Sequence, residues 1–228
     1  MANPGPPGAR TPPVRQPVDS PEAFAQAFAV SRETLAKLVA YEQLLQRWQK
    51  TINLVAASTL KTVWERHFAD SAQLWAYRPA QLETSLDLGS GAGFPGLVLA
   101  IMDSTQRPTR HTLVESDSRK AAFLREVARG TGVTVDILCG RIESAEIHAK
   151  VGAVDCVTAR ALAPLPRLVE LAAPFFGPST LGLLSKGREV TAEIGDAKLA
   201  WDFDIELKPS VTDPDGRVVL LTALKRKS

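Results

Sequence analysis

The chain has 228 residues, of which 45% are hydrophobic and 23% charged, and its formal net charge is +2. This is the balance of an ordinary globular protein, and it excludes a chain that is disordered throughout. The length suffices for one full-sized domain with a small appendage, but not for two independent folds. Because so small a net charge attracts polyanions weakly over distance, any nucleic-acid partner must be bound by a local basic patch.

Residues 1–19 are predicted to form a disordered, proline-rich tail. Seven of the sixteen prolines lie within residues 1–21, and proline supplies no N–H group to a helix or a sheet. The tail contains no apolar signal segment, and the chain nowhere reaches the ~18 uninterrupted apolar residues of a membrane span. We therefore expect a cytoplasmic protein.

Residues 20–80 are predicted to form an N-terminal helical segment. Ser20 can cap the first helix, and Pro21 occupies its first position, where proline is tolerated. A further helix is predicted over residues 60–77, ending before Pro79. Between these helices, apolar residues at three- and four-residue steps form one stripe of packing surface: Leu35, Leu38, Val39, Leu45, Trp48 and Ile52.

Residues 81–228 are predicted to form an α/β domain. Short apolar strands alternate with amphipathic helices, which indicates a mostly parallel sheet covered by helices on both faces. The last two strands, "WDFDIELK" and "RVVLLTAL", are separated only by "PSVTDPDG", which is too short for a parallel crossover and contains turn residues. A mostly parallel, seven-stranded sheet that closes with such an antiparallel hairpin is typical of a Rossmann-like class I S-adenosylmethionine-dependent methyltransferase.

The loop "LDLGSGAGFPG" at residues 86–96 follows the first strand of this domain and predicts a nucleotide cofactor. Gly91, Gly93 and Gly96 formally match GxGxxG, which is the fingerprint of a dinucleotide site. In that fingerprint, however, the first glycine makes the tight turn directly after the strand. The register of the glycines therefore has to be counted from the end of the strand.

The apolar run of the strand ends one residue before Gly89, so Gly89 is the turn glycine. Counted from there the pattern is GxGxG, and Gly89, Gly91 and Gly93 allow the backbone to approach a ligand closely. Pro95, which follows Phe94, starts the next helix early, so fewer N–H groups remain for a pyrophosphate. The loop therefore favours S-adenosylmethionine, which has no pyrophosphate, over NAD.

The ends of the next three strands are predicted to complete the cofactor site. Glu115 can accept hydrogen bonds from ribose hydroxyls, whereas Asp117 is better placed to cap the next helix. Ile142 can cover the adenine, and Glu143 or its backbone can bind the amino edge, with a solvated loop as the alternative. Arg160 can contact the substrate or the cofactor carboxylate, with a solvated charge as the alternative.

Several segments, in order along the chain, resemble one known family. They are "LQRWQKTINLVA", "WERHFADSA", "LDLGSGAGFPGLVLAI", "HTLVESDSRKAAFLREVA", "GRIES", "TARALAPLPRLVELAAPFF" and "LLSKG", and they run from about residue 35 to residue 187. The family is bacterial RsmG, also called glucose-inhibited division protein B. The resemblance implies methylation of a guanine N7 in the decoding-region loop of 16S ribosomal RNA, with S-adenosylmethionine as donor and naked RNA or the small ribosomal subunit as substrate.

The resemblance also implies roles for individual residues. Arg141 and Lys186 match basic family positions near the mouth of the site, and together with Arg66 they are expected to contact RNA phosphates or the target base. The proline-rich tail and the chain beyond residue 188 match no motif of the family. Carried over residue by residue, the family's cofactor contacts fall on Gly89, Phe94, Ile142, Glu143 and Arg160.

The implied reaction needs no acid–base pair. Guanine N7 has a free lone pair and no proton, so the protein has to align the reactants rather than supply a general base. Arg160 is the predicted catalytic residue because it can orient the base or the cofactor. His67 and Asp70 lie three residues apart on one helical face, and we interpret them as a hydrogen-bonding link between helix and domain, not as an acid–base pair.

No metal site is predicted, because the histidines are scattered and the cysteines form no ligand pattern. Cys139 and Cys156 lie in or beside apolar runs and are interpreted as small core residues. We expect a monomer. Three other functions stay open: a class I methyltransferase acting on another RNA, a protein or a small molecule; an NAD-dependent oxidoreductase; and a regulator that binds S-adenosylmethionine without consuming it.

Overall fold

The structure, a computed structural model, describes residues 17–104 and 109–227. The predicted disordered tail falls mostly on residues 1–16, which lie outside the described residues. Val18 is already buried in the core, so the packed chain begins two residues before the helix cap at Ser20. Within the described ranges, no helix is long and apolar enough to cross a membrane.

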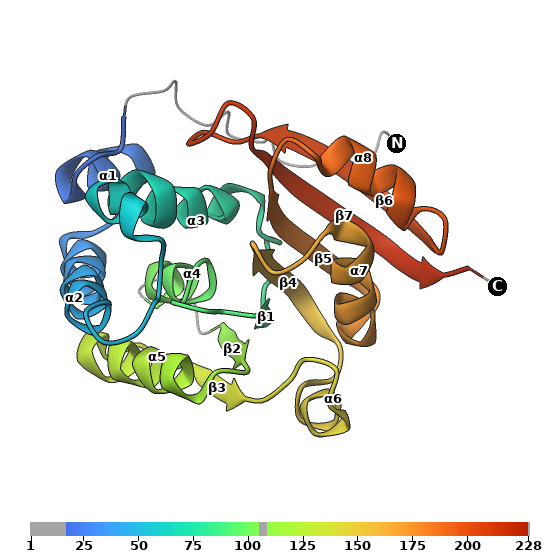
Figure 1. Cartoon of the computed structure of the whole chain (residues 1–228), viewed down its shortest axis with the longest axis horizontal. Helices are drawn as coiled ribbons and strands as arrows, with labels where there is room; N and C mark the ends of the chain where they lie inside the picture. Colours follow the sequence, from blue (N-terminus) through green and yellow to red (C-terminus); the bar gives the residue numbers. More distant parts are fainter. Residues whose placement is uncertain (1–16, 105–108, 228) are drawn as a thin grey trace, which may run out of the picture.

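A seven-stranded sheet forms the centre of the fold, with strand order β3-β2-β1-β4-β5-β7-β6 (Figure 1). The first five strands in this order pair in parallel, and β7 runs antiparallel to both β5 and β6. The predicted class I methyltransferase fold with its antiparallel C-terminal hairpin is therefore confirmed. The strands are β1 Thr84–Leu88, β2 Arg110–Glu115, β3 Asp136–Cys139, β4 Val154–Arg160, β5 Phe176–Lys186, β6 Trp201–Pro209 and β7 Arg217–Arg226.

Helices cover both faces of the sheet. The N-terminal helices pack with α4 and α5 on one face, and α6, α7 and α8 pack on the other (Figure 1). The α-helices are α1 Pro21–Phe28, α2 Arg32–Trp48, α3 Asp70–Ala72, α4 Gly96–Asp103, α5 Ser118–Thr131, α6 Ala145–Val151, α7 Leu165–Ala172 and α8 Val190–Ala197. Shorter 3-10 or π segments are η1 Ala57–Thr62, η2 Trp64–Ala69, η3 Gln73–Tyr77 and η4 Ala173–Phe175.

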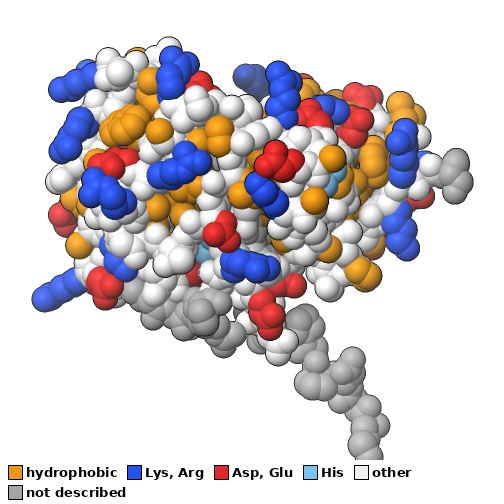
Figure 2. Space-filling view, turned by 90° about the horizontal axis from the view of Figure 1, so that it is seen from below, with side chains coloured by type: hydrophobic (Ala, Val, Ile, Leu, Met, Phe, Trp, Pro, Cys, Tyr) orange, Lys and Arg blue, Asp and Glu red, His pale blue; other side chains and the backbone are white. Residues whose placement is uncertain are grey.

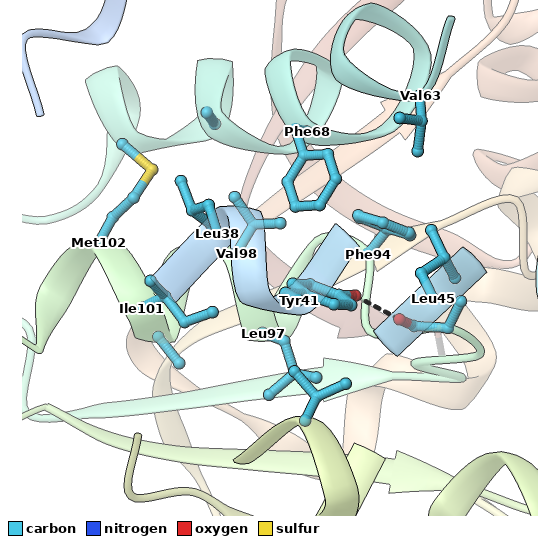
Figure 3. Packing of buried hydrophobic residues seen from close by; sticks show 14 of the residues in the cluster. Leu38, Tyr41, Leu45, Val63, Phe68, Phe94, Leu97, Val98, Ile101 and Met102 are labelled. Atoms are coloured by element: carbon cyan, nitrogen blue, oxygen red, sulfur yellow. Dashed lines mark hydrogen bonds between the residues drawn. The ribbon is translucent and has the colours of Figure 1, made fainter. Parts of the chain in front are cut away.

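The core on the first face joins the N-terminal segment to the α/β domain. Leu38 and Leu45 of the predicted stripe are fully buried, but so is Tyr41, which the stripe did not include. Figure 3 shows Tyr41 beside Phe68 of the N-terminal segment and Phe94 of the glycine loop, and the three rings contact one another. The two predicted parts of the chain thus share one continuous core.

The helix predicted over residues 60–77 is broken into four short segments, η1, η2, α3 and η3. The second segment, η2, is a π-helix, in which the backbone N–H of Asp70 reaches back to Glu65 O. Such turns are rare and are frequently found at functional sites. The chain leaves the helical path at Arg78 in an extended conformation, as expected for a residue that precedes proline.

One of the two predicted core cysteines is not in the core. Cys156, on the central strand β4, is buried, and burial raises the pKa of its thiol to about 12. Cys139 is exposed, because it is the last residue of β3, which lies at the edge of the sheet. The apolar run "VDILC" does not make Cys139 a core residue, because an edge strand is only partly covered.

Candidate cofactor and substrate site

A cavity of about 540 Å³ lies at the carboxyl ends of β1, β2 and β4, where open α/β sheets bind their ligands. Its walls are the glycine loop and the segments that follow β2, β3 and β4, and Leu54 adds a contribution from the N-terminal segment. Three residues predicted for the site lie outside this lining: Arg66, Gly93 and Lys186. The predicted residues that line the cavity are Gly89, Gly91, Phe94, Glu115, Arg141, Ile142, Glu143 and Arg160.

The glycine loop adopts a conformation that side chains resist. The backbone φ is +64° at Gly89, +57° at Gly91 and +94° at Gly93, all in the left-handed region that favours glycine. A Cβ on Gly89 would lie 2.5 Å from a methyl carbon of Leu162. The N–H of Gly93 donates to Ser90 O at 2.7 Å, which closes the turn. The loop is thus a backbone cradle that requires glycine at Gly89 and Gly93, where a side chain would clash.

Tyr41 of α2 supports this cradle from the N-terminal segment. Its hydroxyl donates to the carbonyl of Ala92, and a Cβ on Gly93 would lie 2.5 Å from the same hydroxyl oxygen. Burial raises the pKa of Tyr41 well above its usual range, so the phenol remains a neutral donor. Sequence reasoning missed Tyr41; its position three residues after Leu38 in the apolar stripe was the available signal.

Glu115 closes the other side of the loop. Its carboxylate accepts the N–H of Gly91 at 2.7 Å and the N–H of Asp117 at 2.7 Å. Asp117 caps α5 as predicted, because its Oδ1 accepts the N–H of Arg119 at 2.8 Å. Glu115 lines the cavity with a carboxyl group at the end of β2, the position at which nucleoside-binding folds hold a ribose.

We expect Glu115→Gln to raise the cofactor Kd about 10- to 100-fold, because hydrogen bonds to a charged acceptor contribute about 1.5 to 3 kcal/mol. The matched control is Asp117→Ala. It removes a helix cap and about 1 kcal/mol of stability while leaving the Kd near that of the wild type. Isothermal titration measures both values. A larger loss of affinity in Asp117→Ala than in Glu115→Gln contradicts the assignment.

The loop after β3 supplies an apolar wall and two charged residues. Ile142 is buried, packs in the core of the second face and also lines the cavity. Arg141 is exposed at the rim. The carboxylate of Glu143 is 48% exposed and forms an ion pair with Arg167. This geometry favours the backbone of Glu143, rather than its carboxylate, as the group available to an adenine edge.

Arg160 is held by the N-terminal segment rather than solvated, and its side chain is only 17% exposed. Nη2 donates to Nδ1 of His67 at 2.8 Å, while Nη1 donates to Arg66 O at 2.9 Å and to Asp70 Oδ2 at 3.3 Å. The guanidinium carbon lies 5.2 Å from the ring centroid of Phe94. The interpretation of His67 and Asp70 as a link between helix and domain is therefore confirmed.

His67 is a neutral acceptor in this arrangement. Burial, followed by the nearby Arg160 and Arg66 guanidinium groups, lowers the pKa of His67 to about 3. Because Nδ1 accepts from Arg160, the proton lies on Nε2, which donates to Oγ1 of Thr59 at 2.7 Å. Both ring nitrogens are engaged, so His67 is not available as a general base.

Lys186, which was predicted near the mouth of the cavity, lies outside the cavity lining and is largely buried. Its ammonium is 10% exposed, donates to Ala163 O at 3.0 Å and pairs with Glu193 at 2.5 Å. Glu193 also accepts the backbone N–H of Leu165 at 2.7 Å. The pair therefore fixes the segment that follows Arg160. The family resemblance identified Lys186 as a basic family position, but it did not predict the ion pair with Glu193 of α8.

Sequence reasoning also missed Asp87, which lies beneath the glycine loop on β1. The side chain is buried, and its Oδ1 accepts the hydroxyl of Thr158 at 2.7 Å. Its Oδ2 lies against Gly96, where a Cβ would be 2.7 Å away. Burial raises the pKa of Asp87 to about 6, against the opposing effect of hydrogen bonds from Ser90, Thr158 and Gly96. The signal in the sequence was an acid inside the apolar strand "LDL".

Asp87 should make stability fall as the pH rises. Its folded-state pKa lies above the ordinary value, so the folded state binds the extra proton between these two values, and its stabilising effect is lost as the pH passes about 6. Between about pH 5 and about pH 8, the free energy of unfolding of Asp87→Asn should rise by about 1 to 1.5 kcal/mol relative to that of the wild type. Denaturant unfolding at each pH measures this difference.

Asp155→Asn is the control for this experiment. Burial acts to raise the pKa of Asp155, but hydrogen bonds from Thr84 and Glu83 outweigh it and lower the pKa. Asp155 is therefore ionised in both folded and unfolded states over this range. The difference in free energy of unfolding between Asp155→Asn and the wild type should not change with pH. Parallel pH profiles for Asp87→Asn and the wild type contradict a raised Asp87 pKa.

Comparison with known proteins places the chain in a family. The family model for GidB, described as rRNA small subunit methyltransferase G, matches residues 34–219. The chain belongs to this family. The resemblance found in the sequence motifs is thereby confirmed.

Relatives agree with the GidB assignment over nearly the whole chain. The ribosomal RNA small subunit methyltransferase G of Parvibaculum lavamentivorans is 49% identical over 92% of this chain and 91% of its own length. That of Rhodospirillum centenum is 52% identical over 88% of this chain and 89% of its own length. The chain is therefore similar to these proteins from the N-terminal segment to the C-terminal hairpin.

Solved structures support the fold of the GidB chain. An O-methyltransferase from Bacillus cereus, in complex with SAH, has a TM-score of 0.56 at 12% identity, covering 81% of this chain and 90% of that one. A TehB-like SAM-dependent methyltransferase from Corynebacterium glutamicum has a TM-score of 0.53 at 13% identity, covering 81% and 98%. At these identities the likeness concerns the architecture alone.

S-adenosylmethionine is the cofactor of this GidB protein, and the residues around the cavity fit it. The loop leaves Cβ-free backbone at Gly89, where a side chain would meet Leu162. Glu115 offers carboxyl oxygens as acceptors for hydroxyl groups, and Ile142 offers an apolar wall. When bound, the cofactor supplies an electrophilic methyl group on a sulfonium.

Proposed function

We propose that this protein transfers a methyl group from S-adenosylmethionine to N7 of a guanine in the decoding-region loop of 16S ribosomal RNA. The observation that carries the proposal is a methyl-donor cavity bordered by Arg160, whose neighbouring imidazole is not free to act as a base. His67, the imidazole nearest to Arg160, is engaged at both ring nitrogens. A nucleophile that carries no proton, such as guanine N7, suits this site.

In this proposal the protein's residues orient and shield rather than transfer protons. Gly89, Gly91 and Glu115 bind the nucleoside part of the donor, and Ile142 excludes water from its base. Arg160 directs its guanidinium toward O6 of the acceptor guanine, an acceptor that arginine commonly recognises, and this leaves the N7 lone pair free to attack the methyl group. Alignment of nucleophile and methyl group can account for about 7 to 11 kcal/mol of the barrier in well-oriented model reactions.

RNA contacts are proposed for the basic side chains around the cavity. Arg141 is exposed at its rim, and Arg66 is 46% exposed beside Arg160, where it pairs with Asp213 at 3.1 Å. On the face shown in Figure 2, basic and acidic side chains are interspersed rather than gathered in one field. Binding should therefore depend on these local contacts, with affinity that falls as salt rises. Lys186 is left out of this set because it is paired and largely buried.

A strain that lacks the gene tests the proposal in cells. Small-subunit RNA is treated with a reductant and then with amine, which cleaves the chain at N7-methylguanine. We expect one cleavage site to disappear in the deletion strain, to return with the wild-type gene, and to stay absent with Glu115→Ala. An unchanged cleavage pattern in the deletion strain contradicts the proposed target. Monomeric state, cytoplasmic location and independence from metals stay predictions.

A further inference from the structure

The proposed function gives Arg160 a role that depends on its orientation, and the following inference rests on that function. One helical turn of the N-terminal segment offers Arg160 three acceptors: the carbonyl of Arg66, Nδ1 of His67 and the carboxylate of Asp70. The contacts join residues 90 to 94 positions apart in the sequence, from η2 and the first residue of α3 to the end of β4. Both terminal nitrogens of the guanidinium are therefore fixed.

The π-helical shape of η2 makes this set of acceptors possible. In an α-helix each carbonyl is normally taken by the N–H four residues later. Here the N–H of Asp70 reaches Glu65 O, five residues back, as the wider turn requires. The carbonyl of Arg66 faces Arg160, and the side chains of His67 and Asp70 lie on the same side. The turn thus presents its three hydrogen-bond acceptors to the arginine.

His67 couples Arg160 to the cofactor loop. Its ring stacks on Phe94 with centroids 5.0 Å apart and an interplanar angle of 26°. Its Nε2 donates to Thr59, whose hydroxyl in turn donates to Ala56 O at 2.7 Å. In this series of hydrogen bonds Nε2 is the donor of the ring, so Nδ1 can only accept. The ring is held on its face, at Nδ1 and at Nε2, and it holds Arg160 in turn.

Asp70 couples Arg160 to the turn between β6 and β7. While Oδ2 pairs with Arg160, Oδ1 accepts from Gln73 Nε2 at 2.8 Å and from the hydroxyl of Thr212 at 3.0 Å. Gln73 also holds this turn, because its Oε1 accepts the N–H of Val211 at 2.9 Å. The carboxylate is therefore fixed by two donors before it meets the guanidinium.

We propose that His67 and Asp70 are positioning residues that lock the Arg160 guanidinium in the orientation needed for methyl transfer. Neither has to touch the substrate. Arginine presents its donors in a rigid plane, so two fixed acceptors define the direction of the whole group. The N-terminal segment is then an integral part of the active site and not only a packed appendage.

The test is a double-mutant cycle under single-turnover conditions. We expect His67→Leu and Asp70→Ala each to lower the methyl-transfer rate about 10- to 100-fold, as a misplacement of ~1 Å can. His67→Gln and Asp70→Asn, which keep an oxygen acceptor, should each recover part of the rate. In the Arg160→Ala background, Asp70→Ala should cause almost no further loss, because it acts only through Arg160.

Glu65→Gln is the matched control. Glu65 is an acid on the same turn as Asp70, but the acid that pairs with Arg160 is Asp70. This control should leave the transfer rate and the cofactor affinity unchanged. Thermal unfolding of every variant separates loss of fold from loss of orientation. An undiminished effect of Asp70→Ala in the Arg160→Ala background contradicts positioning, because a structural role acts whether or not the arginine is present.

A second readout does not depend on turnover. Nitrogen NMR of the ring of His67, in protein without cofactor, should show the tautomer with the proton on Nε2. In Arg160→Ala this preference should weaken. A ring of the wild-type protein protonated on Nδ1 contradicts the inference. If Arg160→Ala itself transfers methyl at the wild-type rate, the proposed role of Arg160 fails; if only the His67 and Asp70 variants stay fully active, positioning alone fails.

Discussion

Gly93→Ala is expected to raise the cofactor Kd at least about 100-fold and to lower the free energy of unfolding by about 2 to 4 kcal/mol. The reason is geometric. The backbone φ at Gly93 is +94°, and a Cβ there would lie 2.5 Å from the Tyr41 hydroxyl and 2.7 Å from Leu97 Cδ1. Both neighbours are fully buried, so the loop has to move instead. Isothermal titration and denaturant unfolding measure the two effects.

Two further variants make this result specific. Gly195→Ala, in α8 with open space at its Cβ, should gain about 0.5 to 1 kcal/mol of stability and bind the cofactor normally. Adding Tyr41→Phe to Gly93→Ala removes the nearest clashing atom and should recover part of the lost affinity. A Kd of Gly93→Ala within about threefold of the wild type contradicts the account of the cradle.

Arg160→Ala should have the second large effect, a fall of about 100- to 1000-fold in kcat with cofactor affinity retained, because its role is to orient the acceptor. Stability should also fall by about 1 to 3 kcal/mol, since Asp70 and His67 lose a buried donor. Quench kinetics with saturating RNA and cofactor measure kcat, and titration measures affinity.

Arg160→Lys separates charge from geometry. An ammonium keeps the charge but cannot reach several fixed acceptors in one plane, so its kcat should lie between those of wild type and alanine variant. A lysine variant as active as the wild type shows that charge alone suffices. Loss of cofactor affinity with unchanged kcat assigns Arg160 to the cofactor carboxylate instead, and no change in either quantity removes it from the site.

The fold and much of the site were predictable because their signals are local. The turn glycine Gly89 follows directly from where the apolar strand ends, and Glu115 and Arg160 follow from being the last residues of strands. In a parallel sheet the carboxyl ends of neighbouring strands meet at one edge, so sequence position translates into spatial proximity. The antiparallel hairpin was likewise given by a short connection with turn residues.

What the sequence did not reveal depends on contacts between distant segments. Tyr41 reaches the glycine loop across fifty-one residues, and nothing in the helical pattern of α2 distinguishes a tyrosine that packs from one that also donates. Lys186 was expected near RNA, but its acidic partner Glu193 comes from the following helix. The π turn of η2 was not predicted either, because its residues also suit an ordinary helix.

The most direct test of the central claim is transfer of labelled methyl from S-adenosylmethionine by the purified protein. The acceptors are small-subunit RNA and intact small-subunit particles from a strain that lacks the gene, with the same material from wild-type cells as control. The account predicts that label enters only the unmodified material, at one guanine that becomes cleavable after reduction. Measurable cofactor binding without label in either RNA or particles would contradict it.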